Sequence, residues 1–427
     1  MEATDEAVRG LDVATDVLLA GTGDFAVVIF VPSPGVWQRA GTPGGLSLLE
    51  RQLKQLRKLG DASATLLVPE HDREPELPPA CGPTRIIRVP ASTGDLVAAL
   101  AAVADRLPAE SLAMGADRLV DLRVLGALLR KETTTFASVD GSRPEPVVWV
   151  HAADVRCHGG ALAEHAARLP LATLERYSPE LRGTVEPYVI KCGTSDERRE
   201  AWHVLLDHVQ KRSLDLPGQY FDTPFENFLV RRFAPTDVTP NQITLVTLVV
   251  ASVVAALFLR GWLRVGVVLA LVVGVLDGVD GKLARLKLAT SKLGELEHVG
   301  DFFYENAWYL ALARHLHLAT QRPQLWYAGL VLVGCDLVDS LLYLGVERHT
   351  GRMLDELTPF DRCFRAIAGR RNVYVMILVV GFFSGRAAQA FLCAVVWAGV
   401  TVAVHGFRMM WVLATTARVP RSGVLSS

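Results

Sequence analysis

Four carboxylates lie close together in the chain, at the end of one apolar run and the start of the next. Asp277 and Asp280 are three residues apart and would share one face of a helix. Glu297 and Asp301 are four apart and would do the same on the following helix. A charged side chain at the centre of a membrane helix costs roughly 2.5–3.5 kcal/mol, so a cation must balance these groups. Two antiparallel helices presenting these faces to each other would form an all-oxygen cage suited to a pair of Mg²⁺ or Mn²⁺ ions.

Small residues follow the same two helix faces, at Gly278, Gly281, Ala284 and Gly294. They remove side-chain bulk and would let a flat or phosphate-bearing ligand approach the backbone. Arg285 could bind a phosphate of that ligand or one of the carboxylates.

The alternative is that the acids form structural ion pairs in a helical membrane protein. Lys282, Arg285 and Lys287 are near enough in sequence to act as partners. That interpretation suits a single buried aspartate, whereas the full pattern on two adjoining segments favours a site.

The stretch resembles the signature of the CDP-alcohol phosphotransferases, Asp-x2-Asp-Gly-x2-Ala-Arg-x8-Gly-x3-Asp-x3-Asp. The match runs from Asp277 through Gly294 and includes the eight-residue gap after Arg285. A second match lies at residues 239–244, Thr-Pro-Asn-Gln-Ile-Thr, which is similar to the opening of the catalytic domain in that family. Thr239 can cap a helix there and Pro240 suits its first turn, so we expect a membrane helix to begin at this point.

The signature then departs from the family. His298 and Phe302 stand at its last two aspartate positions, and a shift of one residue restores the pattern as Glu297 and Asp301. Glu297 is the expected third metal ligand, with His298 as the other candidate. Asp301 corresponds to the family's final aspartate, and the resemblance implies that it is the general base.

The resemblance implies transfer of a phosphoryl-alcohol group from a CDP-alcohol, such as CDP-diacylglycerol or CDP-inositol, to an acceptor alcohol, with release of CMP. It also implies a homodimer in contact with membrane lipid. CDP would be bound by residues on the first motif helix and its neighbour: Asp277, Gly278, Gly281, Ala284, Arg285 and Gly294. In relatives that use inositol phosphate acceptors, a basic region binds the acceptor phosphate, and the residues here would be Arg362, Arg365, Arg370 and Arg371.

The composition fits a soluble part joined to a membrane part. The chain has 427 residues, 50% of them hydrophobic and 21% charged, which suggests two or three domains. The formal net charge of −1 gives no indication of nucleic acid as a partner. The six cysteines are scattered without a CxxC pair, so they predict neither a disulfide framework nor a zinc site.

The N-terminal half reads as an α/β domain with a largely parallel sheet, because candidate strands alternate with candidate helices. The strands are expected at 26–31, 64–68 and 85–89, and the helices at 46–59, 95–107 and 121–129. We place this domain at 1–210, a connector with an amphipathic helix at the membrane surface at 211–238, and an all-α transmembrane domain at 239–427.

The α/β domain weakly resembles nucleotidyltransferases, which bind a triphosphate with a Gly-rich loop and a following lysine. Here the loop at 32–43 contains Arg39 but no Gly-x-Gly, and Gly44 stands at the lysine position. A loop that lacks both the Gly-x-Gly and the lysine is poorly suited to bind a triphosphate. We therefore expect the fold without cytidylyltransferase activity, although Asp117 could match the family's metal-binding aspartate.

Six apolar segments follow the connector, at about 243–260, 263–280, 295–314, 325–346, 372–385 and 387–412. Basic residues gather before the first segment, between the second and third, between the fourth and fifth, and after the last. The positive-inside rule then places the N-terminus and the carboxylate motif in the cytosol of a multi-pass protein of the cell (inner) membrane. The first 23 residues lack an apolar core and predict no secretory signal.

Two further functions stay open. The domain order resembles fusions of an inositol-phosphate cytidylyltransferase with a di-myo-inositol-phosphate-phosphate synthase, so the protein could be bifunctional if Asp117 and Arg39 act without the usual lysine. It could instead be a non-catalytic membrane scaffold, given the shifted register at Glu297. Asp336 and Asp339, inside the fourth apolar segment, could bind the acceptor or pair with an arginine of a neighbouring helix.

Overall fold

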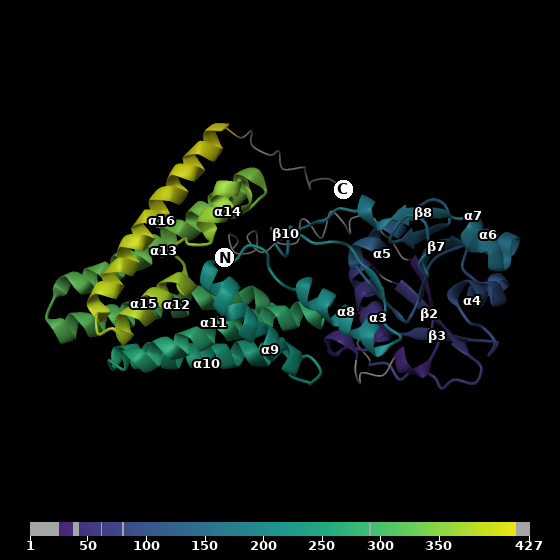
Figure 1. The fold of residues 1–427 in the computed structure, drawn as a ribbon, viewed down its shortest axis with the longest axis horizontal. Coiled ribbons are helices and arrows are strands. Elements are labelled where there is room, and N and C mark those ends of the chain that lie inside the picture. The colour runs from purple at the N-terminus through teal and green to yellow at the C-terminus, as the bar shows by residue number, and fades with distance from the viewer. Residues whose placement is uncertain (1–24, 37–41, 61, 79–80, 290–291, 416–427) are drawn as a thin grey trace. The chain divides into compact units, whose positions relative to one another are not determined.

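The computed structural model describes residues 25–36, 42–60, 62–78, 81–289 and 292–415, and the side chains of residues 292–299 lie outside this description. The chain divides into two compact units, which are treated separately below (Figure 1). The first comprises Met1–Gln210, Arg231–Asp237 and Arg285–Ala289, and the second comprises Lys211–Val230, Val238–Ala284 and Thr290–Ser427.

The first unit is built on a mixed, mainly parallel sheet with the strand order β3-β2-β1-β4-β7-β6-β8. Parallel pairs join β1 to β2 and β4, β2 to β3, and β6 to β8, whereas β7 runs antiparallel to β4 and β6. The strands are β1 (Phe25–Phe30), β2 (Ala62–Pro69), β3 (Thr84–Val89), β4 (Glu110–Gly115), β6 (Thr135–Ser138), β7 (Val147–His151) and β8 (Ala167–Pro170). Two small antiparallel pairs add β5 (Arg118–Val120) with β11 (Val189–Lys191) and β9 (Tyr177–Ser178) with β10 (Gly183–Thr184).

Both faces of this sheet are covered, as continuous apolar strands require. In β1, Val27 and Ile29 belong to the core under α3 (Leu48–Leu59) and α5 (Leu122–Leu128). Val28 and Phe30 point to the opposite core, which α4, α6 and α7 cover (Figure 1). Those helices are α4 (Leu96–Ala102), α6 (Ala152–His158) and α7 (Leu162–His165), and α8 (Ser195–Asp207) follows the last strand. The α/β prediction is confirmed.

The second unit is helical, as expected. A π-helical turn η7 (Gly218–Asp222) leads into α9 (Thr223–Phe233). The long helices are α10 (Pro240–Leu259), α11 (Leu263–Leu286), α12 (Lys292–Thr320), α13 (Pro323–Thr350) and α16 (Ala387–Thr415), with the shorter α14 (Pro359–Arg365) and α15 (Arg371–Phe383) between the last two. They pack around a common apolar core that includes Trp308 and Phe391.

The start of α10 agrees with the sequence prediction. The Thr239 side chain accepts a hydrogen bond from the backbone N–H of Gln242, and the Gln242 side chain accepts one from the N–H of Thr239. This capping box satisfies two backbone donors that the helix itself cannot pair.

Three helices among the described residues are long and apolar enough to cross a membrane, namely α10, α13 and α16. The helix α15 is apolar but has only 13 residues. The apolar helices agree with a membrane protein.

Candidate active site

The two sequence motifs meet in the structure. Asp280, on α11, is 2% exposed, and its Oδ2 accepts a hydrogen bond of 2.8 Å from the Thr244 hydroxyl on α10. Thr244 closes the Thr-Pro-Asn-Gln-Ile-Thr segment and Asp280 is the second acid of the carboxylate motif. This hydrogen bond therefore joins the segment at 239–244 to the carboxylate motif, two separate matches in the sequence.

Asp277 lies one turn earlier on α11 and is paired with a cation from α15. Nη2 of Arg371 donates to Asp277 Oδ2 at 2.5 Å, and Nη1 of the same guanidinium contacts the Tyr304 hydroxyl and lies 3.2 Å from Glu305 Oε1. Tyr304 and Glu305 are on α12, so a single arginine side chain joins three helices at the motif. Glu305 therefore belongs to the same cluster as Asp277.

Asp301 is half-buried near the start of α12. Tyr304 and Glu305 follow it by about one turn on the same helix, and both contact Arg371, the partner of Asp277. Glu297 and His298 fall in the part of α12 whose side chains are not described. The choice between them as third ligand therefore stays a prediction.

The donor set fits a hard divalent cation in its chemistry. Asp277, Asp280 and Asp301 supply carboxylate oxygens only, the ligand type that Mg²⁺ and Mn²⁺ prefer. Among the described residues, no three His, Cys, Asp or Glu side chains are arranged to hold a metal ion. The four-carboxylate cage thus remains a prediction, since the side chain of Glu297 is outside that set.

The space beside Gly278 is occupied by protein. A Cβ at this position would lie 2.1 Å from Oε1 of Glu226, which reaches across from α9. The Glu226 carboxylate ends at the Lys282 ammonium, 2.8 Å away on the next turn of α11. A CDP-binding role for Gly278 stays a prediction, and the side chain now beside it is Glu226.

The other predicted CDP-binding residues lie on the same two helices. Gly281 and Ala284 are partly exposed on α11, and Gly294 is in the first turn of α12. Nε of Arg285 donates to the carbonyl oxygen of Val209 at 2.9 Å.

The four arginines predicted to bind the acceptor have different surroundings. Arg362 is exposed, Arg365 is buried 3.5 Å from both Asp215 and Asp355, and Arg370 lies over the ring of Tyr343 at 4.7 Å. Burial, together with the neighbouring Arg370, lowers the pKa of Arg365 to about 10. Of the four, Arg371 is the one that the structure joins to a motif carboxylate.

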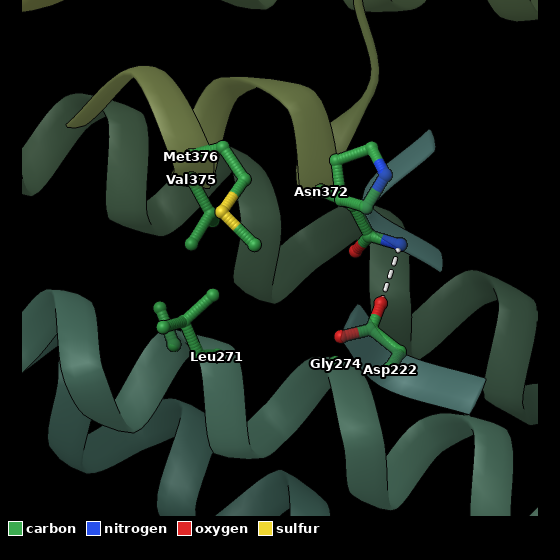
Figure 2. Close-up of a pocket in the computed structure, with 8 residues that line it drawn as sticks. Asp222, Leu271, Gly274, Asn372, Val375 and Met376 are labelled. Atoms are coloured by element: carbon green, nitrogen blue, oxygen red, sulfur yellow. Dashed lines mark hydrogen bonds between the residues drawn. The ribbon is translucent and has the colours of Figure 1, made fainter. Parts of the chain in front are cut away.

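A small cavity lies beside this arginine, between η7, α11 and α15 (Figure 2). Asn372 Nδ2 donates to Asp222 Oδ2 at 3.1 Å across its rim, and Gly274 on α11 lies beside both side chains. A volume of about 10 Å³ holds roughly one water molecule, which excludes a substrate. Burial, together with the charges of Glu226 and Asp215, raises the pKa of Asp222 to about 7 against the opposing effect of Arg371.

Asp336 and Asp339, both on α13, have partners on other helices. Asp336 Oδ2 accepts a hydrogen bond from Asn306 Nδ2 at 2.9 Å, and Asp339 Oδ1 lies 2.6 Å from Nδ1 of His405. From the sequence, these aspartates are expected to bind the acceptor alcohol or to pair with an arginine of a neighbouring helix. In the structure they contact an asparagine and a histidine.

The nucleotidyltransferase-like loop is described only in part. Arg39 lies outside the described residues, and Gly44 has a left-handed φ of 77°. Asp117 follows β4 and lies 3.7 Å from the guanidinium of the adjacent Arg118.

The charged residues outside the motif that lie near it in the structure were not identified from the sequence. The signal for Asp215, Asp222 and Glu226 was available, because three acids stand in a segment with an otherwise aromatic pattern. Nothing in the sequence links Arg371 to Asp277, 94 residues away.

The chain is similar in sequence to known proteins. Residues 237–404 match the sequence model of the family described as CDP-alcohol phosphatidyltransferase. A protein of Rubrobacter xylanophilus, the bifunctional IPC transferase and DIPP synthase, is 26% identical over 91% of this chain and 94% of its own. The proteins of that name in Thermococcus kodakarensis and Aquifex aeolicus are 32% and 27% identical, and each match spans about a third of either chain.

Among solved structures, the chain is similar to phosphatidylinositol phosphate synthase of Mycobacterium tuberculosis, crystallised with CDP-DAG bound. The TM-score is 0.35 and the identity 18%, over 44% of this chain and 93% of the other.

Proposed function

Because residues 237–404 match the family model described as CDP-alcohol phosphatidyltransferase, we propose that this protein transfers a phosphoryl-alcohol group from a CDP-alcohol to the hydroxyl of an acceptor alcohol and releases CMP. The observation that carries the proposal is the junction of the two family motifs at Thr244 and Asp280, with Asp277 one turn away and Asp301 beside the same cluster.

In the proposed reaction the acceptor oxygen bonds to the phosphorus that carries the donor alcohol, and the bond from that phosphorus to the CMP oxygen breaks. Asp301 accepts the proton of the acceptor hydroxyl. Asp277, Asp280, Glu297 and Asp301 would hold two Mg²⁺ or Mn²⁺ ions, which when bound neutralise the pyrophosphate charge. The Thr244 hydroxyl orients Asp280, and Arg371 balances the charge of Asp277 and Glu305.

The proposal extends to the ligands and the setting. Gly281, Ala284, Arg285 and Gly294 would contact CDP, and an acceptor phosphate would bind among Arg362, Arg365, Arg370 and Arg371. The protein would be a homodimer that spans the membrane several times, with the site facing the cytosol. Product classes that fit are a phospholipid and a polyol phosphodiester.

The test is CMP release by the purified, detergent-solubilised protein with Mg²⁺ or Mn²⁺. CDP-diacylglycerol and CDP-inositol are offered in turn against polyols and polyol phosphates. We expect release by the wild type, loss on chelation with EDTA, and a loss of at least about a hundredfold in Asp301→Asn, in line with removal of a general base. Asp105→Asn, an exposed carboxylate of the α/β unit, serves as the matched control.

A second candidate is a bifunctional enzyme that also makes the CDP-alcohol. The Rubrobacter relative favours it, because the match covers both halves of the chain. The loop at 32–43, without its glycines and lysine, argues against it. The assay measures pyrophosphate release from CTP in the presence of a polyol phosphate. Release that is abolished by Asp117→Asn would establish the second activity. No release from a protein that is active in phosphotransfer would exclude it.

A further inference from the structure

A buried lysine lies in the middle of the carboxylate motif. Lys282 is 2% exposed, although it follows Asp280 by only two residues. Its Nζ lies 2.8 Å from Glu226 Oε2 and donates to Asn227 Oδ1 at 2.7 Å. Taking an ammonium group out of water costs several kcal/mol unless its partners are well placed. The position of Lys282 therefore depends on α9, the helix that supplies both partners.

The Glu226 side chain also packs against α11 one turn earlier, at Gly278. A Cβ there would lie 2.1 Å from Oε1 and 2.2 Å from Cδ of Glu226, closer than any real side chain allows. The Glu226 side chain thus crosses the backbone of α11 at the residue after Asp277 and ends at Lys282. Glu226 thus contacts α11 at Gly278 and Lys282, next to the turn that carries Asp277 and Asp280.

The Glu226 carboxylate lies on the buried face of α9. Glu226 and Val230 are buried, whereas Phe225 and Phe228 are 53% and 68% exposed. A helix on a soluble protein would have the opposite arrangement. The aromatic face suits the membrane interface, and the acidic residue on the inner face meets the motif helix.

We propose that Glu226 and Lys282 are positioning residues of the transferase: their ion pair sets the rotation and height of the α11 turn that presents Asp277 and Asp280. The inference rests on the proposed function. A misplacement of about 1 Å can cost on the order of a hundredfold in rate, so the pair would matter to the reaction without touching the substrate.

The experiment uses the full-length protein and three variants, Lys282→Met, Glu226→Gln and the double variant. Each single change removes one half of a buried ion pair, so both Tm and kcat/KM should fall. The double variant removes both charges and should recover most of the Tm. We expect its kcat/KM for CMP release to stay at least about tenfold below wild type. Full recovery of kcat/KM together with Tm would overturn the proposal, because a purely structural pair predicts that result.

A stability-matched control separates position from general destabilisation. Phe391→Leu leaves a small cavity in the apolar core of the helical unit, because the Phe391 side chain on α16 is 0% exposed. It should lower Tm with kcat/KM within about twofold of wild type. A drop in kcat/KM equal to that of the double variant would also count against a specific role of the pair.

Hydrogen exchange gives a reading that does not depend on catalysis. In the double variant, amides of residues 277–286 should exchange at least about tenfold faster than in wild type, with α16 unchanged. If the wild type releases no CMP, the proposed function fails, and this exchange result still decides whether the pair holds α11. Unchanged exchange in 277–286 would overturn the positioning role.

Discussion

At the scale of single residues, the motif carboxylates are held by partners that lie outside the motif. Asp277 is paired with Arg371 and Asp280 with Thr244. An acid in an apolar helix needs such a partner, and a guanidinium binds carboxylates and phosphates alike. The sequence predicts the acids well because their spacing is local. It predicts their partners poorly, because those come from other helices.

Asp222 is predicted to make stability depend on pH. Its folded-state pKa is raised to about 7 from an ordinary value of 3.8, so the folded protein binds this proton more tightly than the unfolded chain. This contribution to stability is complete below about pH 4 and is lost as pH rises towards 7. Asp222→Asn removes the charge and keeps the shape. We therefore expect it to raise Tm more at pH 8 than at pH 4, measured by thermal unfolding in detergent.

The matched control for that measurement is Asp105→Asn, since Asp105 is exposed on the other unit. Its Tm difference from wild type should be flat across the same pH range. A gain from Asp222→Asn that is equal at both pH values would contradict the raised pKa as its cause.

Gly278 allows the function of a motif glycine to be tested directly. Gly278→Ala should lower kcat/KM, because the added methyl group would force Glu226 off Lys282. In a Glu226→Ala background the same change should have little further effect, since the space is then empty. If the alanine costs as much in both backgrounds, Gly278 makes room for a ligand and not for Glu226.

At the scale of elements, the contact between α10 and α11 is the most direct support for the site. Thr244→Val removes the hydroxyl that donates to the buried Asp280 and keeps the side-chain volume. Residues that orient a metal ligand typically contribute about ten- to hundredfold in metal affinity. We therefore expect Mn²⁺ affinity, measured by electron paramagnetic resonance titration, to fall by about that factor.

Thr247→Val is the matched control, because its hydroxyl is also buried on α10 but donates to the carbonyl of Ile243 in the same helix. Mn²⁺ affinity in this variant should stay within about twofold of wild type. An equal loss in both variants would show that the effect comes from α10 as a whole.

The elements themselves could largely be predicted from the sequence. β1 to β3, α3 and the start of α10 follow from apolar runs, helical spacing and a capping box, all of which are local signals. β4 was missed because Glu110–Gly115 has no alternation and ends in small residues, and it becomes a strand through pairing with β1 and β7. The expected helix at 95–107 is interrupted after Ala102, and a 3₁₀ turn covers Ala104–Arg106.

At the scale of the whole molecule, the α/β unit is discontinuous in sequence. Residues 285–289, at the end of the motif helix, belong to the α/β unit, as do residues 231–237. Hydrophobicity and composition mark the change near residue 210, but they carry no information on which unit a helix end packs against. A domain boundary read from the sequence therefore separates residues that fold together.

Arg51 shows what such a separation would cost. It is 3% exposed on α3, and its Nη2 donates to the carbonyl oxygen of Leu286 at 2.6 Å. The same guanidinium fills the space beside Gly44, where a Cβ would lie 2.3 Å from it. Burial lowers the pKa of Arg51, and a chain ending at residue 210 loses one acceptor of this cation.

Arg51→Met should consequently have different effects in two proteins. In the full chain it should lower the free energy of unfolding by roughly 1–3 kcal/mol, because the Leu286 carbonyl loses a buried donor. In a fragment of residues 1–210 it should change the free energy of unfolding much less, since the arginine there already lacks that carbonyl. Lys54→Met on the same helix, whose partner Glu50 is present in both proteins, should change stability by the same amount in each. An equal loss of stability from Arg51→Met in both would show that Arg51 is satisfied within residues 1–210, and that the α/β unit does not need the end of the motif helix.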